Sequence, residues 1–243
     1  MPTALILGAT SDMGMAVAKK FAQEKYNIQL AGRNTAALAP LKSDLEIRFG
    51  ISCTAHQFDA ADFNSHQAFY DNLPVKPEVT VCVVGYMNDN EKVIADFSET
   101  LNTINSNYTG LVSILNIISK DYADKQSGVI VGISSVAGLR GRQSNYIYGS
   151  AKAAFTAYLS GLRNRLYHHK VHVVTVLPGF VYTKMTADLA LPKLLTAYPE
   201  QVGDAIYKAV QKRKNVIYVK WFWKWIMLII TSIPENMFKK KKL

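Results

Sequence analysis

Seven short apolar runs alternate with longer segments of helical spacing, and this alternation constrains the fold more than any other feature of the chain. The segments between the runs, among them Met13–Glu24, Ala36–Arg48 and Tyr148–Leu166, repeat apolar side chains at the period of an α-helix. Runs this apolar are typical of strands covered on both faces, and strands separated by helices pair in parallel. The sequence therefore predicts an α/β fold with a doubly wound parallel sheet and a ligand site at the carboxyl ends of its strands. The predicted strands are Ala4–Leu7, Ile28–Ala31, Thr54–Phe58, Val79–Val84, Val129–Ile133, Val171–Leu177 and Val216–Val219.

Length and composition predict one large domain in a reducing compartment. With 243 residues the chain can bury a full core, and single α/β domains commonly reach about 250 residues. The 49% share of hydrophobic residues and the two cysteines exclude a disordered chain and a disulfide scaffold. Cys53 and Cys82 lie in apolar, strand-like surroundings, and Met1–Gly8 lacks the basic region of a signal peptide. We therefore expect a cytoplasmic location.

The positive charge is concentrated at the C-terminal end. Residues 1–204 hold 18 basic and 17 acidic side chains, whereas residues 205–243 hold 10 basic side chains and one acidic side chain. A nucleic-acid-binding protein normally spreads basic residues over a whole face of its fold. The asymmetry therefore argues against a nucleic-acid partner and favours a local contact of the C-terminus with a membrane surface.

A glycine-containing turn follows the first predicted strand. Gly8 and Gly14 flank a strand-to-helix junction, where glycine lets the backbone approach a phosphate and the helix N-terminus offers free N–H groups. Tight strand-to-helix turns also contain glycine for purely steric reasons. The second predicted strand ends at Arg33, where folds that bind NAD usually present a carboxylate to the ribose. A guanidinium fits a 2′-phosphate, so NADP(H) is the expected cofactor, and a solvated loop arginine is the alternative.

Ser135, Tyr148 and Lys152 form the second chemical pattern. Tyr148 and Lys152 are four residues apart within a predicted helix and so share one face. A tyrosine beside an ammonium group has its phenolate stabilised, which would lower the pKa of Tyr148 toward the range of a general acid. Reduction of a ketone needs such a proton donor.

In order and spacing, six separated segments resemble the short-chain dehydrogenase/reductase family, whose Rossmann-type fold would cover residues 3–219. The segments are Gly8–Gly14, Asp59, Ile104–Gly110, Gly132–Gly138, Tyr148–Lys152 and Pro178–Thr183. The resemblance implies that Tyr148 donates the proton, Lys152 binds the nicotinamide ribose, Ser135 polarises the carbonyl and Asn107 holds a water in a proton relay. It implies a cofactor-binding set of Gly8, Thr10, Ser11, Asp12, Met13, Gly14, Arg33, Asn34, Asp59, Ala60, Gly85, Tyr148, Lys152, Pro178, Gly179, Val181 and Thr183.

Two positions depart from the family pattern. Asp12 stands where the family has the middle glycine of the first turn, and Cys82-Val83-Val84-Gly85 replaces Asn-Asn-Ala-Gly. We expect Asp12 to cap the helix that follows, although its charge lies near the expected phosphates. Both departures are similar to those of the decaprenylphosphoryl-2-keto-sugar reductases within the family, which act on a sugar attached to a polyprenyl phosphate.

Residues 220–243 form an aromatic and basic tail beyond the predicted domain of residues 1–219. A helix over Trp221–Ile233 would measure about 20 Å, too short for roughly 30 Å of hydrocarbon. Its three tryptophans suit the headgroup level of a membrane, and Lys239–Lys242 would attract an anionic leaflet. The alternative is that the tail packs on the domain or forms an oligomer contact.

We therefore expect an NADPH-dependent reductase that converts a carbonyl to an alcohol on a lipid-linked or hydrophobic substrate, such as a polyprenyl-phosphate keto-sugar, at the cytosolic face of a membrane. The alternatives are a long-chain 3-ketoacyl or ketosphinganine reductase, a soluble carbonyl reductase whose tail serves oligomerisation, and a non-enzymatic NADPH-sensing adaptor. A homodimer or homotetramer fits the family.

Two further features bear on the substrate and on metals. Arg140 and Arg142 follow Ser135 on a loop expected to border the substrate pocket, where they would grip a phosphate or merely be solvated. The His168–His172 cluster lacks the cysteine or carboxylate neighbours of a metal site, so no metal is expected.

Overall fold

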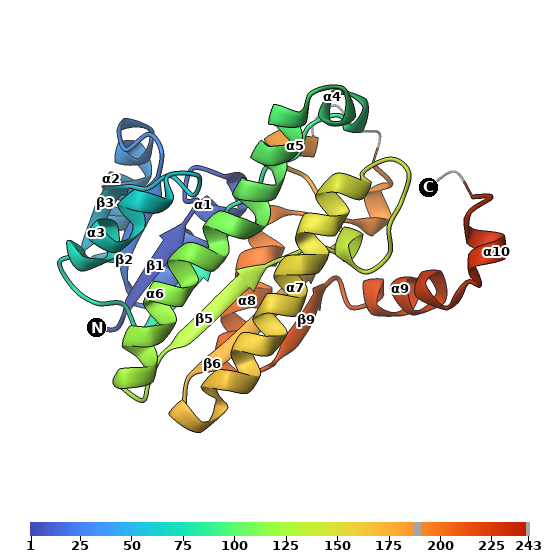
Figure 1. Ribbon diagram of the computed structural model, residues 1–243. Coiled ribbons are helices and arrows are strands. Elements are labelled where there is room, and N and C mark those ends of the chain that lie inside the picture. The colour runs from blue at the N-terminus through green and yellow to red at the C-terminus, as the bar shows by residue number, and fades with distance from the viewer. Residues whose placement is uncertain (187–190, 242–243) are drawn as a thin grey trace.

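The computed structural model describes residues 1–186 and 191–241, and it contains a seven-stranded parallel sheet with helices on both faces (Figure 1). All seven predicted strands are confirmed, with ends that differ by at most two residues. In chain order the elements are β1 (Thr3–Leu7), α1 (Asp12–Gln23), β2 (Asn27–Gly32), α2 (Ala39–Phe49), β3 (Cys53–Gln57), α3 (His66–Asp71), β4 (Val79–Cys82), α4 (Asn90–Ala95), α5 (Phe97–Ile104), α6 (Gly110–Asp124), β5 (Val129–Ile133), α7 (Tyr146–Leu166), β6 (His172–Pro178), β7 (Phe180–Val181), β8 (Thr196–Ala197), α8 (Pro199–Gln211), β9 (Val216–Val219), α9 (Trp223–Ser232) and α10 (Glu235–Phe238).

The sheet separates two apolar layers because successive side chains of a strand point to opposite faces. In β1, Ala4 and Ile6 pack with α1, α2 and α8, whereas Leu5 and Leu7 pack with α3, α6 and α7. All five residues of β1 are buried, as expected for a strand covered on both sides. Figure 1 shows α6 and α7 side by side across one face of the sheet.

The strand order β3-β2-β1-β4-β5-β6-β9 contains one change of direction, between β1 and β4. The chain moves outward from β1 to β3 and then returns to the other side of β1. The connections that follow β1 and β4 therefore diverge, and they leave a crevice at the carboxyl ends of these strands. This is where the sequence predicts the ligand site.

The C-terminal segment packs on the domain through one of its sides. Trp223 and Met227 of α9 are buried against Val136 and Leu177, which belong to the loop after β5 and to β6. Figure 1 shows α9 and α10 extending beyond the β9 edge of the sheet. The alternative that the tail packs on the domain is therefore right for this side of α9.

The helix of the tail is shorter than predicted. It begins at Trp223 rather than Trp221, because the chain turns through the left-handed backbone of Lys220, whose φ is 59°. No helix within residues 1–186 and 191–241 combines the length and the apolar composition needed to cross a bilayer. Lys242, the last of the predicted lysines, lies outside the described residues.

The close approach of α6 to the loop after β3 yields a test of the packing. A Cβ on Gly110 would lie 1.8 Å from the carbonyl oxygen of Ala60, which is backbone and cannot rotate away. Gly110→Ala should therefore destabilise the protein by about 2 kcal/mol or more in urea unfolding.

Gly161 offers a matched control in the middle of α7, since a Cβ there meets nothing within 4 Å. Gly161→Ala should stabilise the protein by about 0.5–1 kcal/mol through helix propensity. Equal shifts of the two variants would show that the Gly110 contact is not needed.

Candidate active site

A cleft of about 460 Å³ opens at the carboxyl ends of β1, β4, β5 and β6, and it is lined by most of the residues predicted from the sequence. The predicted residues in its wall are Gly8, Thr10, Ser11, Asp12, Met13, Arg33, Asp59, Ala60, Gly85, Ser135, Tyr148, Lys152, Pro178, Gly179, Val181 and Thr183. Gly14, Asn34 and Asn107 lie behind or beside this wall rather than in it.

The turn after β1 is compact because two glycines allow backbone contacts that a Cβ would block. Gly8 has a φ of 88°, and a Cβ on it would lie 2.9 Å from the amide nitrogen of Val84. A Cβ on Gly14 would lie 2.4 Å from the carbonyl oxygen of Gly8. The turn thus holds the N-terminus of α1 against the ends of β1 and β4, with free backbone facing the cleft.

Ser11 rather than Asp12 caps α1, so the prediction for Asp12 is wrong. The Ser11 hydroxyl donates to the Gly8 carbonyl at 2.8 Å and accepts from the Gly14 amide at 3.0 Å. Asp12 is already inside the helix, and its carboxylate accepts from the backbone N–H of Lys184 at 2.7 Å. The acidic side chain therefore ties the first turn to the segment that follows β7.

Arg33 and Asn34, which follow β2, have different surroundings. Arg33 is exposed and lines the cleft, and it forms no ion pair with any residue in the described ranges 1–186 and 191–241. Asn34 uses its side-chain oxygen to accept from the Ala37 amide at 3.2 Å. Asp59, which follows the neighbouring strand β3, accepts from the Ala61 amide at 3.0 Å.

Asn107 lies in a π-helical turn, Asn105–Thr109, that joins α5 to α6. Such turns often occur at functional sites, because the wider spacing re-aims a side chain. The buried Asn107 amide donates to the carbonyls of Tyr86 and Thr103 at 2.6 and 2.8 Å, and its oxygen accepts from the Tyr86 amide at 3.2 Å. Asn107 thereby fixes the backbone of Tyr86 in the segment after β4. A Cβ on Gly85 would lie 3.4 Å from the side-chain oxygen of Asn107.

Ser135, Tyr148 and Lys152 meet on one wall of the cleft. Ser135 follows β5, and its hydroxyl accepts from the Ala137 amide at 3.1 Å. Tyr148 lies in the first turn of α7, and Lys152 lies one turn later. The buried Lys152 ammonium donates to the Ile133 carbonyl at 3.2 Å and lies 5.8 Å from the centroid of the Tyr148 ring.

The loop after β5 is fixed on α7, which sets the distance between Ser135 and Tyr148. The Ser134 hydroxyl donates to the carbonyl of Lys152 at 2.8 Å and lies 2.7 Å from the Thr156 hydroxyl. A Cβ on Gly138 would lie 2.6 Å from the Ala153 amide nitrogen, so the loop and the helix are in backbone contact.

Burial controls the charges of this wall. It raises the pKa of Tyr148 to about 12, against a smaller lowering by the hydrogen bond with Ser135. It lowers the pKa of Lys152 to about 8. The lowering of the Tyr148 pKa that the sequence predicts is therefore not found in this structure, because desolvation of the buried phenol raises that pKa.

Arg140 is not available to the cleft, contrary to its interpretation as a phosphate ligand. Its guanidinium donates to the carbonyls of Thr231 and Ile233 at 3.0 Å and to the carboxylate of Glu235 at 2.8 Å, and it lies 4.1 Å from the centroid of the Phe238 ring. It fastens the tail to the domain. Arg142, by contrast, lines the cleft.

Two contributors to the site escape sequence reasoning. Asn145 lines the cleft and is the residue just before α7, where its side chain forms no capping bond. Trp223 lies behind the cleft wall, where its indole fills the space beside Gly179 and donates to the Leu195 carbonyl at 3.1 Å. A polar residue at a predicted helix start is a signal for Asn145, whereas nothing local signals Trp223.

The described residues contain no group of three His, Cys, Asp or Glu side chains arranged to hold a metal ion. The polar side chains in the cleft wall instead include hydroxyls, phenols, cations and the separate carboxylates of Asp12 and Asp59.

A model of the short chain dehydrogenase family matches residues 2–193. The chain is 28% identical over 239 residues to an uncharacterized oxidoreductase of Mycobacterium tuberculosis, and this match covers 97% of the chain and 95% of the relative. It is 25% identical to an NADP-dependent 3-hydroxy acid dehydrogenase of Schizosaccharomyces pombe, over 88% of this chain and 89% of the relative. A short-chain dehydrogenase from Sphingobium yanoikuyae in complex with NADPH shares the fold, with a TM-score of 0.85, 23% identity and 97% of each chain covered.

The buried Lys152 should weaken the folded state in a pH-dependent manner. Its folded pKa of about 8 lies below the value of 10.5 for an unperturbed lysine, so the penalty is fully present below pH 8 and is lost as the pH rises from about 8 to 10.5. Lys152→Met should raise the free energy of unfolding at pH 7 by on the order of 2 kcal/mol. Its advantage over the wild type should shrink at pH 9.5.

Urea unfolding at the two pH values measures this difference. The exposed Lys19 on α1 provides the control, and Lys19→Met should change stability little at either pH. A Lys152→Met protein that is less stable than the wild type at pH 7 would contradict the electrostatic account.

Proposed function

Since the chain belongs to the short-chain dehydrogenase family and is an oxidoreductase, we propose that it reduces a ketone to an alcohol with NADPH. One observation carries the proposal: Ser135, Tyr148 and Lys152 line the same cleft as the turn that begins at Gly8. A hydroxyl and a phenol on the same wall can donate to one carbonyl oxygen as negative charge develops on it. An NADP-dependent relative and a fold neighbour in complex with NADPH support the choice of cofactor.

The residues at the Gly8 end fit a dinucleotide phosphate. Gly8 and Gly14 let the turn pack tightly on the backbone of Val84 and of Gly8 itself, and the turn precedes the positive end of α1. The Asp12 carboxylate, which would repel a phosphate, is turned to the Lys184 amide. The exposed Arg33 suits the additional 2′-phosphate of NADP.

The remaining members of the proposed cofactor set would follow the cleft from the adenine to the nicotinamide end. Asp59 and Ala60 would flank the adenine. The full set is Gly8, Thr10, Ser11, Asp12, Met13, Gly14, Arg33, Asn34, Asp59, Ala60, Gly85, Tyr148, Lys152, Pro178, Gly179, Val181 and Thr183.

When bound, NADPH supplies the hydride, and the side chains of the chain handle the proton and the developing charge. Ser135 donates a hydrogen bond to the carbonyl oxygen, and Tyr148 donates a hydrogen bond and then its proton. A pKa of about 12 keeps Tyr148 protonated at neutral pH and so ready to donate. Lys152 would hold the nicotinamide ribose, and Asn107 would position a water that returns a proton to the site.

The tail supports a hydrophobic or lipid-linked substrate. The side of α9 that faces away from Trp223 and Met227 exposes apolar side chains, and basic residues flank it. The exposed apolar residues of the tail are Trp221, Trp225, Leu228, Ile229 and Met237, and the described lysines around them are Lys220, Lys224, Lys239, Lys240 and Lys241. The only acidic residue of this segment, Glu235, is paired with Arg140. An apolar strip with uncompensated positive charge suits an anionic membrane surface.

We therefore propose that residues 1–219 form the NADP-binding domain and that residues 220–243 form a membrane-associating tail. One side of this tail, with Trp223 and Met227, packs on the domain. A membrane-bound enzyme of this kind can take a ketone from the bilayer, such as a keto-sugar carried on polyprenyl phosphate. Association into dimers or tetramers is compatible with this arrangement.

Replacing the proposed proton donor tests the catalytic proposal. Tyr148→Phe should lower the rate of NADPH-dependent ketone reduction by about 10²–10⁴-fold, because the phenol is the general acid. NADPH binding, followed by fluorescence titration, should change by less than about threefold, since the ring remains. Wild-type turnover by the variant would overturn the assignment, and equal binding of NADH and NADPH to the wild type would overturn the role of Arg33.

Sedimentation with vesicles tests the membrane contact. The full-length protein should sediment with phosphatidylglycerol vesicles and be released by high salt. Trp225→Asp combined with Ile229→Asp should abolish sedimentation, because carboxylates would enter the apolar strip.

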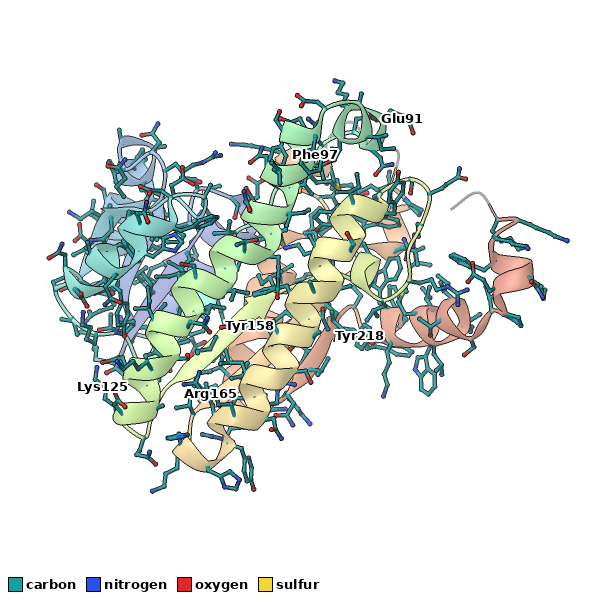
Figure 2. The ribbon with its side chains drawn as sticks, viewed as in Figure 1. Glu91, Phe97, Lys125, Tyr158, Arg165 and Tyr218 are labelled. Atoms are coloured by element: carbon teal, nitrogen blue, oxygen red, sulfur yellow. The ribbon has the colours of Figure 1, made fainter. Side chains whose placement is uncertain are left out.

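Phe97 on α5 provides the matched control (Figure 2). It is 70% exposed, against 67% for Ile229, and it lies on a different element. Phe97→Asp should leave sedimentation intact. If the wild type stays in the supernatant while the tail variant loses an oligomeric state, the tail is an oligomer contact instead.

A further inference from the structure

We propose that Arg142, together with Asn145, forms an anion-binding subsite beside Ser135 and Tyr148, so that the ketone substrate carries a carboxylate or phosphate. This inference rests on the proposed reductase function and names the chemical class of its substrate. Neither residue has a role in the reduction described above, and both line the cleft.

Backbone hydrogen bonds connect the two residues to each other and to the helix that carries Tyr148. Both residues lie in the loop that leads from Ser135 to α7. The Asn145 amide donates to the Arg142 carbonyl at 3.2 Å, and the Asn145 carbonyl accepts from the Gly149 amide at 2.8 Å. The start of α7, which carries Tyr148, therefore fixes the position of both residues.

The polar atoms of this pair lack partners in the described part of the chain. Arg142 Nε and Asn145 Oδ1 are both buried without a hydrogen bond. The guanidinium donates through Nη2 to the sulfur of Met227 at 3.4 Å, which is a weak acceptor. Buried polar groups are nearly always satisfied, so both side chains have unused hydrogen-bonding capacity. Because both residues line the cleft, a ligand there that reorients the two side chains can supply the missing partners.

The neighbouring arginine of the same loop differs from Arg142 because it has strong partners. Arg140 has two carbonyls, an aromatic ring and the carboxylate of Glu235 as partners. The acidic side chain of the tail is thus committed to Arg140, and no carboxylate within the described ranges forms an ion pair with Arg142. Burial lowers the pKa of Arg142, but an arginine keeps its charge. A half-buried positive charge therefore faces the cleft.

The surroundings narrow the chemistry of the ligand. Apolar side chains, among them Met87, Phe180 and Met185, also line the cleft. A carboxylate or phosphate can accept from a guanidinium in a charge-assisted contact, while the free acceptor of Asn145 requires a hydroxyl or N–H on the same molecule. The subsite fits a hydroxylated, anionic ketone with an apolar portion. A long-chain ketone with an uncharged reactive end would leave Arg142 unpaired.

Pairs of ketones that differ in one charge test the proposal. One pair is 4-oxopentanoate and its methyl ester, and the other is dihydroxyacetone phosphate and dihydroxyacetone, so that carboxylate and phosphate are distinguished. The wild type with NADPH should show a kcat/KM at least about tenfold higher for the charged member of one pair. Arg142→Gln should reduce that ratio to near one, mainly through KM.

Two further variants separate a specific contact from a general effect of charge. Asn145→Asp is nearly isosteric and would place a carboxylate beside Arg142, so it should also remove the preference. Arg165→Gln removes the same charge from the last turn of α7, far from Tyr148 along the helix, and should retain the preference (Figure 2). A charge preference that survives in Arg142→Gln, or a wild type that reduces neutral and anionic ketones equally, overturns the subsite while leaving the reductase function in place.

A failure of the reductase function itself has a different signature. In that case the wild type binds NADPH but reduces neither pair. Calorimetric titration with inorganic phosphate and with 4-oxopentanoate then decides the subsite separately: at least about tenfold weaker binding to Arg142→Gln than to the wild type supports it, and equal binding overturns it.

Discussion

The parallel pairing of β1 with β2 on one side and with β4 on the other is the constraint on which the rest of the structure depends. It aligns Leu7 with Ala31 and with Cys82, so the three strands end at the same level. The hydrogen bonds continue beyond the strands, because the Gly8 amide donates to Ala31 and the Val83 amide donates to Leu7. Because the strand order changes direction between β1 and β4, the connections that leave these two strands diverge, and the cleft lies between them.

Much of this arrangement can be predicted from the sequence because it depends on local periodicity. The strands are short and apolar enough to be recognised singly, and the pairing of Tyr148 with Lys152 follows from the geometry of one helix. Most of the expected cofactor residues line the cleft for a similar reason, since they follow strand ends. What the cleft binds and how it reacts are proposals that build on this placement.

The features that could not be predicted depend on contacts between distant segments or on burial. The bond from the Lys184 amide to Asp12 spans 172 residues, and the commitment of Arg140 to the tail spans more than 90. The direction of the pKa shift of Tyr148 depends on how completely the fold excludes water from its surroundings. No spacing rule contains that information, because the dielectric environment is a property of the assembled wall.

The indole of Trp223 occupies the space that any side chain at position 179 would need, since a Cβ on Gly179 would lie 1.9 Å from the ring. Although the C-terminal segment comes last in the sequence, it is therefore not a module that is independent of the cleft wall. Related enzymes that differ in this segment would have to change both positions together. A chimera that exchanges only the C-terminal segment would carry a void or a collision directly behind the part of the cleft wall that Gly179 forms.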